Sequence, residues 1–160
     1  MNLYFIRHAE AEPTTDTKPH EERELTENGK QILIISIDFW RNYIRNFEII
    51  LSSPLKRAIQ TARIVKEEMK VNADVLEEVS LLNGGMTEDI VTLVNSLGME
   101  DVALVGHQPD LGIHISRLTG SGETNLKISP ATIAKISFRT SAMIGKGVLE
   151  FLIPPVHKKG

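Results

Sequence analysis

Arginine and histidine residues follow three apolar runs of this sequence, close to the points where those runs end. Arginine carries a rigid set of N–H donors that matches phosphate oxygens, and it stays charged at any relevant pH. A neutral imidazole can attack phosphorus and carry the phosphoryl group as a covalent intermediate. Together these residue types predict a phosphate site that also transfers the group. They are Arg7 and His8 after the run 3–6, Arg57 after the run 48–51 and His107 after the run 102–105.

The three apolar runs have the pattern of buried strands, and helix-like segments follow them along the chain. In open α/β sheets, ligands bind outside the carboxyl ends of the strands, so we expect the four side chains to converge. Arg57 falls in the first turn of its helix, where side chains lean back toward the N-terminus. The free N–H groups at that helix end also favour an anion. Gly106, directly before His107, permits close approach of the backbone to a ligand.

Residue spacing alone leaves open whether His8 or His107 is the nucleophile. Beside Arg7, Arg57 and a protonated His107, the pKa of His8 should be lowered, which keeps its imidazole unprotonated and reactive at neutral pH. The same cations would hold the charge that develops on the phosphoryl oxygens. We therefore expect all four residues to bind phosphate and to take part in catalysis.

A leaving group needs a proton, and a carboxylic acid at the end of the expected third strand is a candidate donor. Glu78, and with less support Glu77, closes that strand and could act if burial raises its pKa. Glu10 and Glu12, in the loop after His8, are rivals for the same role. Two adjacent glutamates are also typical of a solvated strand end.

The remaining histidines have less defined roles. His20 lies in the polar segment 10–24, which has no periodicity and predicts an exposed loop beside the pocket, so it contacts either substrate or nothing. His114 is expected to pack within a helix, and His157 belongs to the C-terminal tail. The histidine spacing does not match the helical pattern of zinc sites. The absence of cysteine excludes disulfides and thiol catalysis. We expect neither a metal nor a cofactor.

Strand-like and helix-like patterns alternate along the chain, which predicts an α/β protein: a three-layer α/β/α sandwich around a mostly parallel central sheet. The last two strands are joined by a segment too short for a helical crossover, so we expect these C-terminal strands to be antiparallel. The expected strands cover 3–6, 48–51, 73–78, 102–105, 133–138 and 148–153, and the expected helices begin after residue 26, at 54, at 87 and at 109 or 110.

Individual residues mark where these helices begin and end. Thr26 and Ser53 are the expected N-caps of the first two helices, with Pro54 in the first turn of the second. Gly98 and Gly120 are expected to end the third and fourth helices. Apolar residues at steps of four and three predict one buried stripe along the first helix, formed by Leu33, Ile37, Trp40, Ile44 and Phe47.

Composition limits the class of protein. A chain of 160 residues fits one domain over residues 1–160. Its net charge of −3 at pH 7, with neutral histidines, gives no sign of a broad basic face for nucleic acid. No apolar stretch approaches the roughly 20 residues that a membrane span needs, and the N-terminus shows no basic leader or cleavage site. We expect a soluble, cytoplasmic protein that binds neither nucleic acid nor membranes.

The motifs around these residues resemble those of the histidine phosphatase superfamily, which has the phosphoglycerate mutase-like fold. Residues 7–9, Arg-His-Ala, resemble the Arg-His-Gly signature of that family, with an alanine that is typical of its SixA-type branch. Residues 53–62, Ser-Pro-Leu-Lys-Arg-Ala-Ile-Gln-Thr-Ala, are very similar to its second motif. Residues 106–107 and 25–29 also fit, so the resemblance covers nearly the whole chain in the right order. It is closest to the small phosphohistidine phosphatases of SixA type.

The resemblance implies that His8 is phosphorylated. It places Glu78 roughly where mutase-like relatives carry their acid. The asparagine that mutases and sugar-phosphate phosphatases carry shortly after the signature is absent, since residues 11–13 are Ala-Glu-Pro. The phosphate pocket that the resemblance implies is formed around His8 by Arg7, Arg57 and His107.

The function implied by the resemblance is hydrolysis of phosphohistidine on a phosphorylated protein, through a covalent intermediate and without metal. Little sequence is available for a lid, either in residues 83–87 or after Gly120, which favours an open site for a phosphate presented on a protein. The nearest alternative is a phosphatase acting on small phosphate esters, such as a sugar phosphate or a nucleotide. A second is a non-catalytic domain that binds phosphorylated proteins, and a third is a metal-dependent hydrolase.

Overall fold

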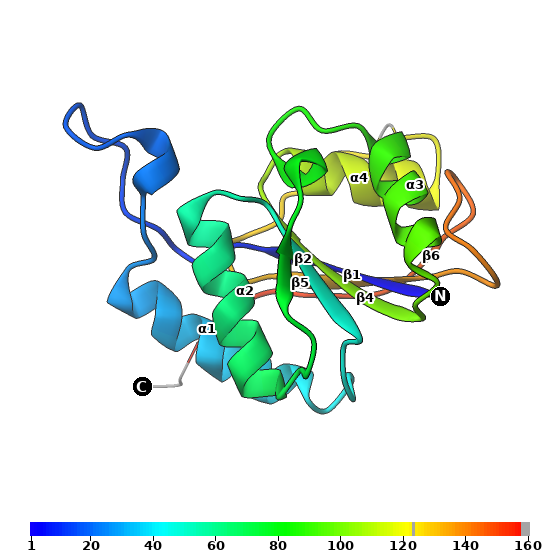
Figure 1. Ribbon diagram of the computed structural model, residues 1–160, viewed down its shortest axis with the longest axis horizontal. Coiled ribbons are helices and arrows are strands. Elements are labelled where there is room, and N and C mark those ends of the chain that lie inside the picture. Colours follow the sequence, from blue (N-terminus) through cyan, green and yellow to red (C-terminus); the bar gives the residue numbers. More distant parts are fainter. Residues whose placement is uncertain (123, 158–160) are drawn as a thin grey trace.

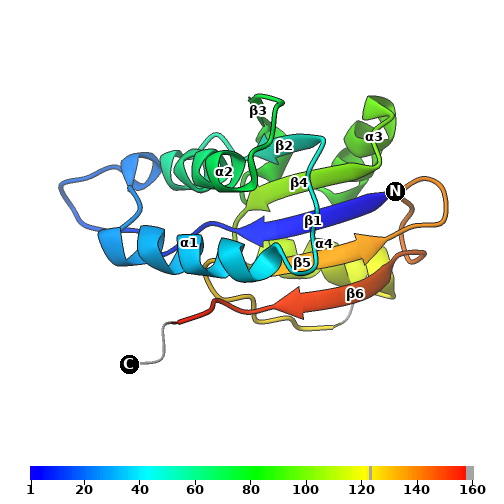
Figure 2. The ribbon, with the colours of Figure 1, turned by 90° about the horizontal axis from the view of Figure 1, so that it is seen from below.

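Six strands form one mixed sheet at the centre of the protein (Figure 1, Figure 2). The computed structural model describes residues 1–122 and 124–157. The strands are β1 (Asn2–Arg7), β2 (Ile49–Ser52), β3 (Val75–Glu77), β4 (Asp101–Gly106), β5 (Ile133–Ser137) and β6 (Val148–Ile153). Their order across the sheet is β3-β2-β4-β1-β5-β6. Strands β1 to β4 run parallel, β5 is antiparallel to β1, and β6 is antiparallel to β5, as the sequence predicts.

Within the described residues, four helices cover the two faces of the sheet, which confirms the predicted three-layer α/β/α architecture (Figure 2). The helices are α1 (Glu27–Trp40), α2 (Lys56–Met69), α3 (Thr87–Leu97) and α4 (Asp110–Thr119). Helices α1 and α2 pack on one face, whereas α3 and α4 pack on the other. Two short 3-10 turns, η1 (His20–Glu22) and η2 (Val79–Leu81), lie in the loops after β1 and β3.

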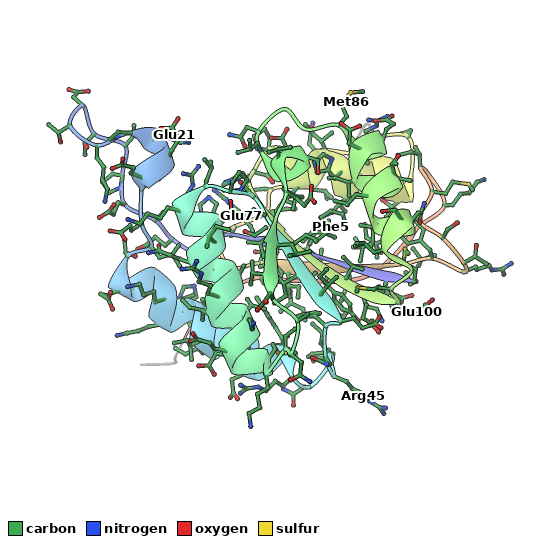
Figure 3. All side chains as sticks on the ribbon, viewed as in Figure 1. Phe5, Glu21, Arg45, Glu77, Met86 and Glu100 are labelled. Carbon is green, nitrogen blue, oxygen red and sulfur yellow. The ribbon has the colours of Figure 1, made fainter. Side chains whose placement is uncertain are left out.

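Successive residues of a strand face opposite helical layers, because side chains alternate across a β-strand. Tyr4 and Ile6 belong to the apolar cluster under α1 and α2, whereas Leu3 and Phe5 belong to the cluster under α3 and α4. Figure 3 shows Phe5 inside the protein between these layers. Since both faces of the sheet are covered, the central parallel strands β1, β2 and β4 carry runs of buried apolar residues, and this is why they stand out in the sequence.

Helix α1 begins where the sequence predicts but ends earlier than its apolar stripe. Thr26 is the N-cap, and its hydroxyl accepts a hydrogen bond from the backbone N–H of Gly29 at 2.9 Å. The helix ends at Trp40, and the chain turns through shorter-range bonds such as that from the N–H of Asn42 to the carbonyl of Phe39. The last two residues of the predicted stripe are buried beyond the helix end, as continuations of the same cluster; they are Ile44 and Phe47.

Helix α2 begins later than predicted, and the expected cap at Ser53 is wrong. The N-cap position is occupied by Leu55, which has extended backbone geometry and no side-chain cap bond. The hydroxyl of Ser53 instead lies 2.7 Å from the ring of His107. Strand β3 is also shorter than the predicted 73–78, because β2 pairs only with Val75–Glu77. Both deviations concern the segments that surround the ends of β2 and β4.

The second half of the chain follows the prediction closely. Helix α3 ends at Gly98, which has a φ of 64° and so adopts the left-handed conformation that glycine tolerates best. Helix α4 begins at Asp110 and is followed by Gly120 at its C-cap. His114 is buried in α4 and hydrogen-bonds to Thr87 at 2.9 Å, as a packing residue would. Among residues 1–122 and 124–157, no helix has the length and apolar character to cross a membrane.

Candidate active site

His8 directly follows β1 and is held by its neighbours on both sides. Its backbone N–H donates to the carbonyl of Gly106 at 3.1 Å, which ties it to the end of β4. Its ring Nδ1 lies 2.7 Å from the carbonyl oxygen of Ala9. Because a carbonyl can only accept, the ring proton sits on Nδ1 and the lone pair is on Nε2. The imidazole therefore presents a nucleophilic nitrogen on the side away from its own backbone.

Burial and nearby positive charge keep the imidazole of His8 neutral. The side chain is almost entirely buried, and burial, together with the smaller effect of the charges of Arg57, Arg7 and Arg23, lowers the pKa of His8 to about 4. The hydrogen bond to Ala9 works in the opposite direction but is outweighed. At neutral pH the ring is thus unprotonated, as the sequence predicts.

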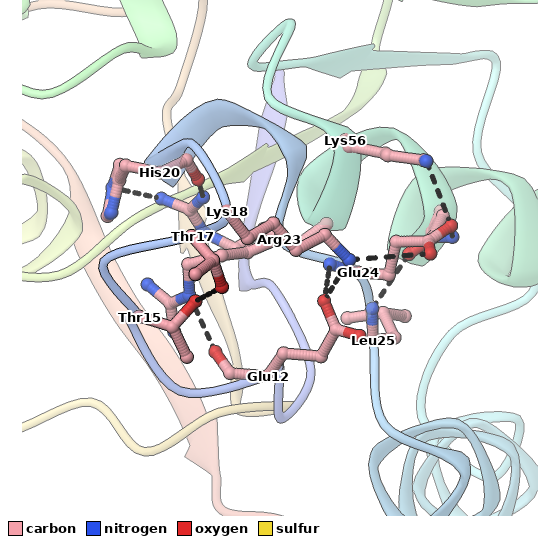
Figure 4. A network of polar contacts seen from close by, with 11 residues as sticks. Glu12, Thr15, Thr17, Lys18, His20, Arg23, Glu24, Leu25 and Lys56 are labelled. Carbon is pink, nitrogen blue, oxygen red and sulfur yellow. Dashed lines mark hydrogen bonds and ion pairs between the residues drawn. The ribbon is translucent and has the colours of Figure 1, made fainter.

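Arg57 places a charged guanidinium beside the ring of His8. It lies in the first turn of α2 and is only 2% exposed. Its Nε donates to Nε2 of His8 at 3.3 Å, so the guanidinium touches the atom that carries the lone pair. The outer nitrogens contact His20 of η1: Nη1 donates to its carbonyl at 3.0 Å, and Nη2 lies 2.9 Å from its Nε2 (Figure 4). His20, whose role the sequence leaves open, therefore belongs to this site.

His107 follows β4 and lies across from His8. The two imidazole rings are 5.1 Å apart between centroids, at an angle of 57°. Burial, followed by the charges of His8, Arg57 and other neighbours, lowers the pKa of His107 to about 3. His107 is therefore neutral at pH 7, and the protonated His107 expected from the sequence is wrong for the protein by itself. An anion placed beside the ring would raise this pKa, since opposite charge favours the protonated form.

Arg7 lies beside the two histidines but turns part of its guanidinium toward another segment. Its Nη1 donates to the carbonyl of Ile128 at 2.6 Å. Its charge lowers the pKa of both His8 and His107. Within the described part of the chain, Nε of Arg7 and Nδ1 of His107 are buried without a hydrogen-bond partner. Buried polar groups normally have partners, so these two atoms suit an oxyanion that binds between the arginines and histidines.

The backbone of the candidate acid Glu78 lies near the site, but its side chain lies elsewhere. Its N–H donates to the carbonyl of Ser52 at 2.8 Å, at the end of β2. Its half-buried side chain lines a cavity of about 510 Å³ together with Val79 and Met86, a cavity that none of the four arginine and histidine residues lines. No hydrogen bond joins the described Glu78 carboxylate to those four residues. Glu77 is exposed (Figure 3).

The rival carboxylates of the loop have other partners. Glu10 accepts a hydrogen bond from Thr26 at the start of α1. Glu12 accepts from Lys18 at 2.5 Å and from a backbone N–H at 3.0 Å, and these bonds lower the pKa of its carboxyl group. Both side chains are therefore engaged in contacts that hold the loop in place. Neither is a suitable proton donor as placed.

The loop that carries His20 is fastened to the helix that carries Arg57. Glu24 pairs with Lys56 at 3.0 Å and accepts a hydrogen bond from Gln60 at 3.2 Å, both in the first turns of α2 (Figure 4). Arg23, which the sequence analysis did not single out, donates to the carbonyl of Glu12 at 2.6 Å. Its charge adds to the lowering of the pKa of His8. The sequence does not indicate this effect of Arg23 on His8, because Arg23 is one charged residue among several in a polar loop.

No group of three or more histidine, aspartate or glutamate residues that could hold a metal ion occurs among residues 1–122 and 124–157. The chemistry that the described side chains themselves support is anion binding by two guanidinium groups and attack by a neutral imidazole. The geometry brings together Arg7, His8, Arg57 and His107, as predicted, and adds His20, Ser53 and Arg23 around them.

Known proteins share both the sequence pattern and the fold. The family model of the histidine phosphatase superfamily (branch 1) matches residues 3–92. An uncharacterized protein of Picosynechococcus is 34% identical over 115 residues, which cover 70% of this chain and 69% of the relative.

Solved structures of several phosphatases superpose on nearly the whole chain. The protein histidine phosphatase SixA complexed with tungstate has a TM-score of 0.85 at 23% identity, covering 97% of each chain. The α-ribazole phosphatase of Shigella flexneri has a TM-score of 0.73 at 17% identity, covering 99% of this chain and 100% of the other. The mycobacterial glucosyl-3-phosphoglycerate phosphatase has a TM-score of 0.70 at 15% identity, covering 97% and 99%. At these identities the likeness establishes the phosphoglycerate mutase-like fold.

The motif residues predicted from the sequence thus meet in one buried site, and the matches to known proteins cover more than half of the chain. The protein belongs to the histidine phosphatase superfamily, branch 1, and is a phosphatase.

Proposed function

We propose that the protein hydrolyses phosphohistidine on a phosphorylated protein, through a covalent phosphoryl intermediate on His8. The observation that carries this proposal is the state of the His8 ring. Its proton is committed to the carbonyl of Ala9, while its lone pair faces the guanidinium of Arg57. A neutral imidazole whose unprotonated nitrogen lies beside fixed positive charge is a prepared nucleophile for an incoming dianion.

The reaction has two displacements at phosphorus. In the first, Nε2 of His8 forms a bond to phosphorus while the P–N bond of the substrate breaks, and the substrate imidazole leaves with a proton of its own or from solvent. In the second, water attacks phosphorus, the bond to His8 breaks, and inorganic phosphate leaves while the water proton passes to solvent. Arg7 and Arg57 hold the phosphoryl oxygens through both steps. His107 takes up a proton beside the dianion and donates to a third oxygen.

The position of Glu78 favours phosphohistidine over phosphate esters as substrate. An alkoxide leaving group requires an acid, whereas an imidazole can be protonated before it leaves. The carboxylate of Glu78 lines a neighbouring cavity, so assistance to a small alkoxide is the weaker use of this site. The likeness in fold to a protein histidine phosphatase agrees with this choice. The likeness to two phosphatases named for small esters makes such esters the alternative substrates.

A quench experiment with labelled phosphodonor tests the intermediate. Incubation with a labelled phosphohistidine protein should give enzyme carrying label that is lost in acid and stable in base, as expected for phosphohistidine. His8→Ala should carry none, while the matched variant His114→Ala, which changes a buried histidine outside the site, should still be labelled. Acid-stable label, or label on His8→Ala, would overturn the role of His8.

Relative rates test the substrate. The value of kcat/KM for a phosphohistidine protein should exceed those for a panel of sugar phosphates and nucleotides, and a reversed order would select the ester alternative.

Turnover of a generic aryl phosphate would exclude a domain that only binds phosphoproteins. Turnover that persists after treatment with a chelator would exclude the metal-dependent hydrolase. A cytoplasmic location belongs to the same proposal and is checked by cell fractionation.

A further inference from the structure

The contact between Arg57 and His20 has no place in the reaction described so far. His20 is an exposed residue of η1, in the loop between β1 and α1. It nevertheless accepts two hydrogen bonds from one buried guanidinium, at 3.0 Å through its carbonyl and at 2.9 Å through its ring. An exposed side chain normally gains little from ordering itself, so a two-point contact with the central cation of the site calls for a function.

The numbers of N–H donors and acceptors determine which group donates in this contact. Arginine has five N–H donors and no acceptor. Nε2 of His20 must therefore accept from Arg57, which requires a neutral ring with its proton on Nδ1. Of the five donors of Arg57, one points to His8 and two point to His20. The other two, and the Nε donor once His8 has attacked, are the ones left for phosphoryl oxygens.

We propose that His20 is a positioning residue, whose neutral imidazole holds the outer edge of the Arg57 guanidinium so that its inner donors face the phosphoryl group. This inference rests on the proposed role of Arg57 as a phosphate ligand, but it does not depend on which phosphorylated substrate is bound. The anchoring of the loop to α2, through the pair of Glu24 with Lys56 and Gln60, keeps His20 in register with Arg57.

The positioning contact is sensitive to protons. When His20 takes up a proton, Nε2 becomes a donor and the ring becomes a cation beside Arg57, so the contact is lost. The charged and titratable groups nearest to the ring come from several elements. Arg57 of α2 contacts it and also contacts His8 after β1, the charges of Arg23 and Glu21 in the loop act on Arg57, and the charge of His20 itself acts on His107 after β4.

Two substitutions separate positioning from a general structural role. His20→Ala removes the ring acceptor but keeps the backbone carbonyl, so kcat/KM should fall about tenfold, the size of one charge-assisted hydrogen bond at an exposed position. His20→Gln supplies a side-chain oxygen that accepts but does not titrate, and it should restore most of the activity. Since His20 is exposed, the thermal unfolding midpoint should be unchanged in both variants.

The pH profile is the decisive readout. Wild type and His20→Gln are compared from pH 5 to pH 8 with phosphohistidine protein and with an aryl phosphate. The ratio of wild-type to His20→Gln kcat/KM should fall on acidification, since only the wild type loses its acceptor. Protonation of the substrate affects both enzymes equally and cancels in the ratio.

Three results would overturn the inference: full activity in His20→Ala, a ratio that does not change with pH, or a ratio that rises on acidification. The last would indicate that the imidazolium of His20 binds phosphate directly. Affinity for inorganic phosphate, measured by calorimetry, repeats the comparison without turnover. If the phosphohistidine protein is not hydrolysed but phosphate affinity follows the predicted pattern, then the proposed substrate fails while the role of His20 stands.

Discussion

Replacing Arg57 by glutamine tests the arrangement of the site at its centre. The guanidinium is buried, and it connects α2 both to Nε2 of His8 after β1 and to His20 in the loop. Removal of one preorganised donor group from a developing oxyanion costs about 2–4 kcal/mol, which corresponds to roughly 30- to 1000-fold in kcat. Glutamine occupies much of the same space, so the loss should reflect charge and donor geometry more than a cavity.

The same substitution should change the titration of His8. The charge of Arg57 lowers the pKa of His8, but burial is the larger cause of its value of about 4. In Arg57→Gln the pKa should therefore rise, yet stay below the ordinary 6.5. Arg57→Lys keeps a charge without the forked donors, so it should leave the pKa of His8 closer to that of the wild type while kcat remains reduced.

Steady-state kinetics and NMR titration of the histidine rings measure the two effects separately. Arg63→Gln, on the exposed side of the same helix, is the matched control and should keep wild-type turnover. Turnover of Arg57→Gln within threefold (about 0.7 kcal/mol) of the wild type would refute the proposed phosphate pocket. A pKa of His8 that does not move would show that the guanidinium is farther from the ring in solution than in the structure.

Two further predictions concern protons. The free energy of unfolding should fall as the pH drops from 7 to 4, by on the order of 3 kcal/mol for each buried histidine of the site, because unfolded imidazoles take up protons near pH 6.5 while the pKa values of folded His8 and His107 are about 4 and about 3. Denaturation with urea across this range should give a shallower dependence in His107→Ala, and an identical dependence would contradict the lowered pKa. Glu78→Gln should reduce kcat/KM for phosphohistidine less than about threefold, because the Glu78 carboxylate lines a neighbouring cavity and an imidazole can be protonated before it leaves. Glu77→Gln is the control, and a large loss on phosphohistidine in Glu78→Gln alone would contradict the argument for this substrate.

The convergence of the main site residues was predictable because it depends on periodicity and topology. Unbroken apolar runs mark strands covered on both faces, and the parallel β-strands place their carboxyl ends at one edge. His8, His107 and the first turn of α2 follow from that rule without any knowledge of loops. The antiparallel β5 and β6 follow from the shortness of their connection.

The remaining contacts depend on the paths of irregular segments, which carry no periodic signal. Ser53 fits a helix cap by residue type, but the chain continues extended through Leu55, and its hydroxyl reaches His107 instead. The contact of His20 with Arg57 depends on how the loop folds back over α2. The charge of His107 depends on burial that residue spacing does not measure.

His8 and His107 have different roles in the proposed reaction, and the partners of their Nδ1 atoms account for the difference. In His8 this atom is bonded to the carbonyl of Ala9, so the ring can react only through Nε2. In His107 it is Nε2 that meets the hydroxyl of Ser53, while Nδ1 is buried and has no partner among the described residues.

Neutral rings limit repulsion in the pocket before substrate binds, since the two imidazoles then add no charge to that of the arginines. An arriving phosphoryl dianion raises the pKa of both rings. Protonation of His8 would displace the bond that its Nε2 accepts from Arg57, whereas Nδ1 of His107 is buried without a partner among the described residues. A proton that enters with the phosphate therefore goes to His107, which becomes a donor, while His8 keeps the lone pair that attacks. Residue type alone would allow either histidine to be the nucleophile, and the hydrogen bond to Ala9 is what distinguishes them.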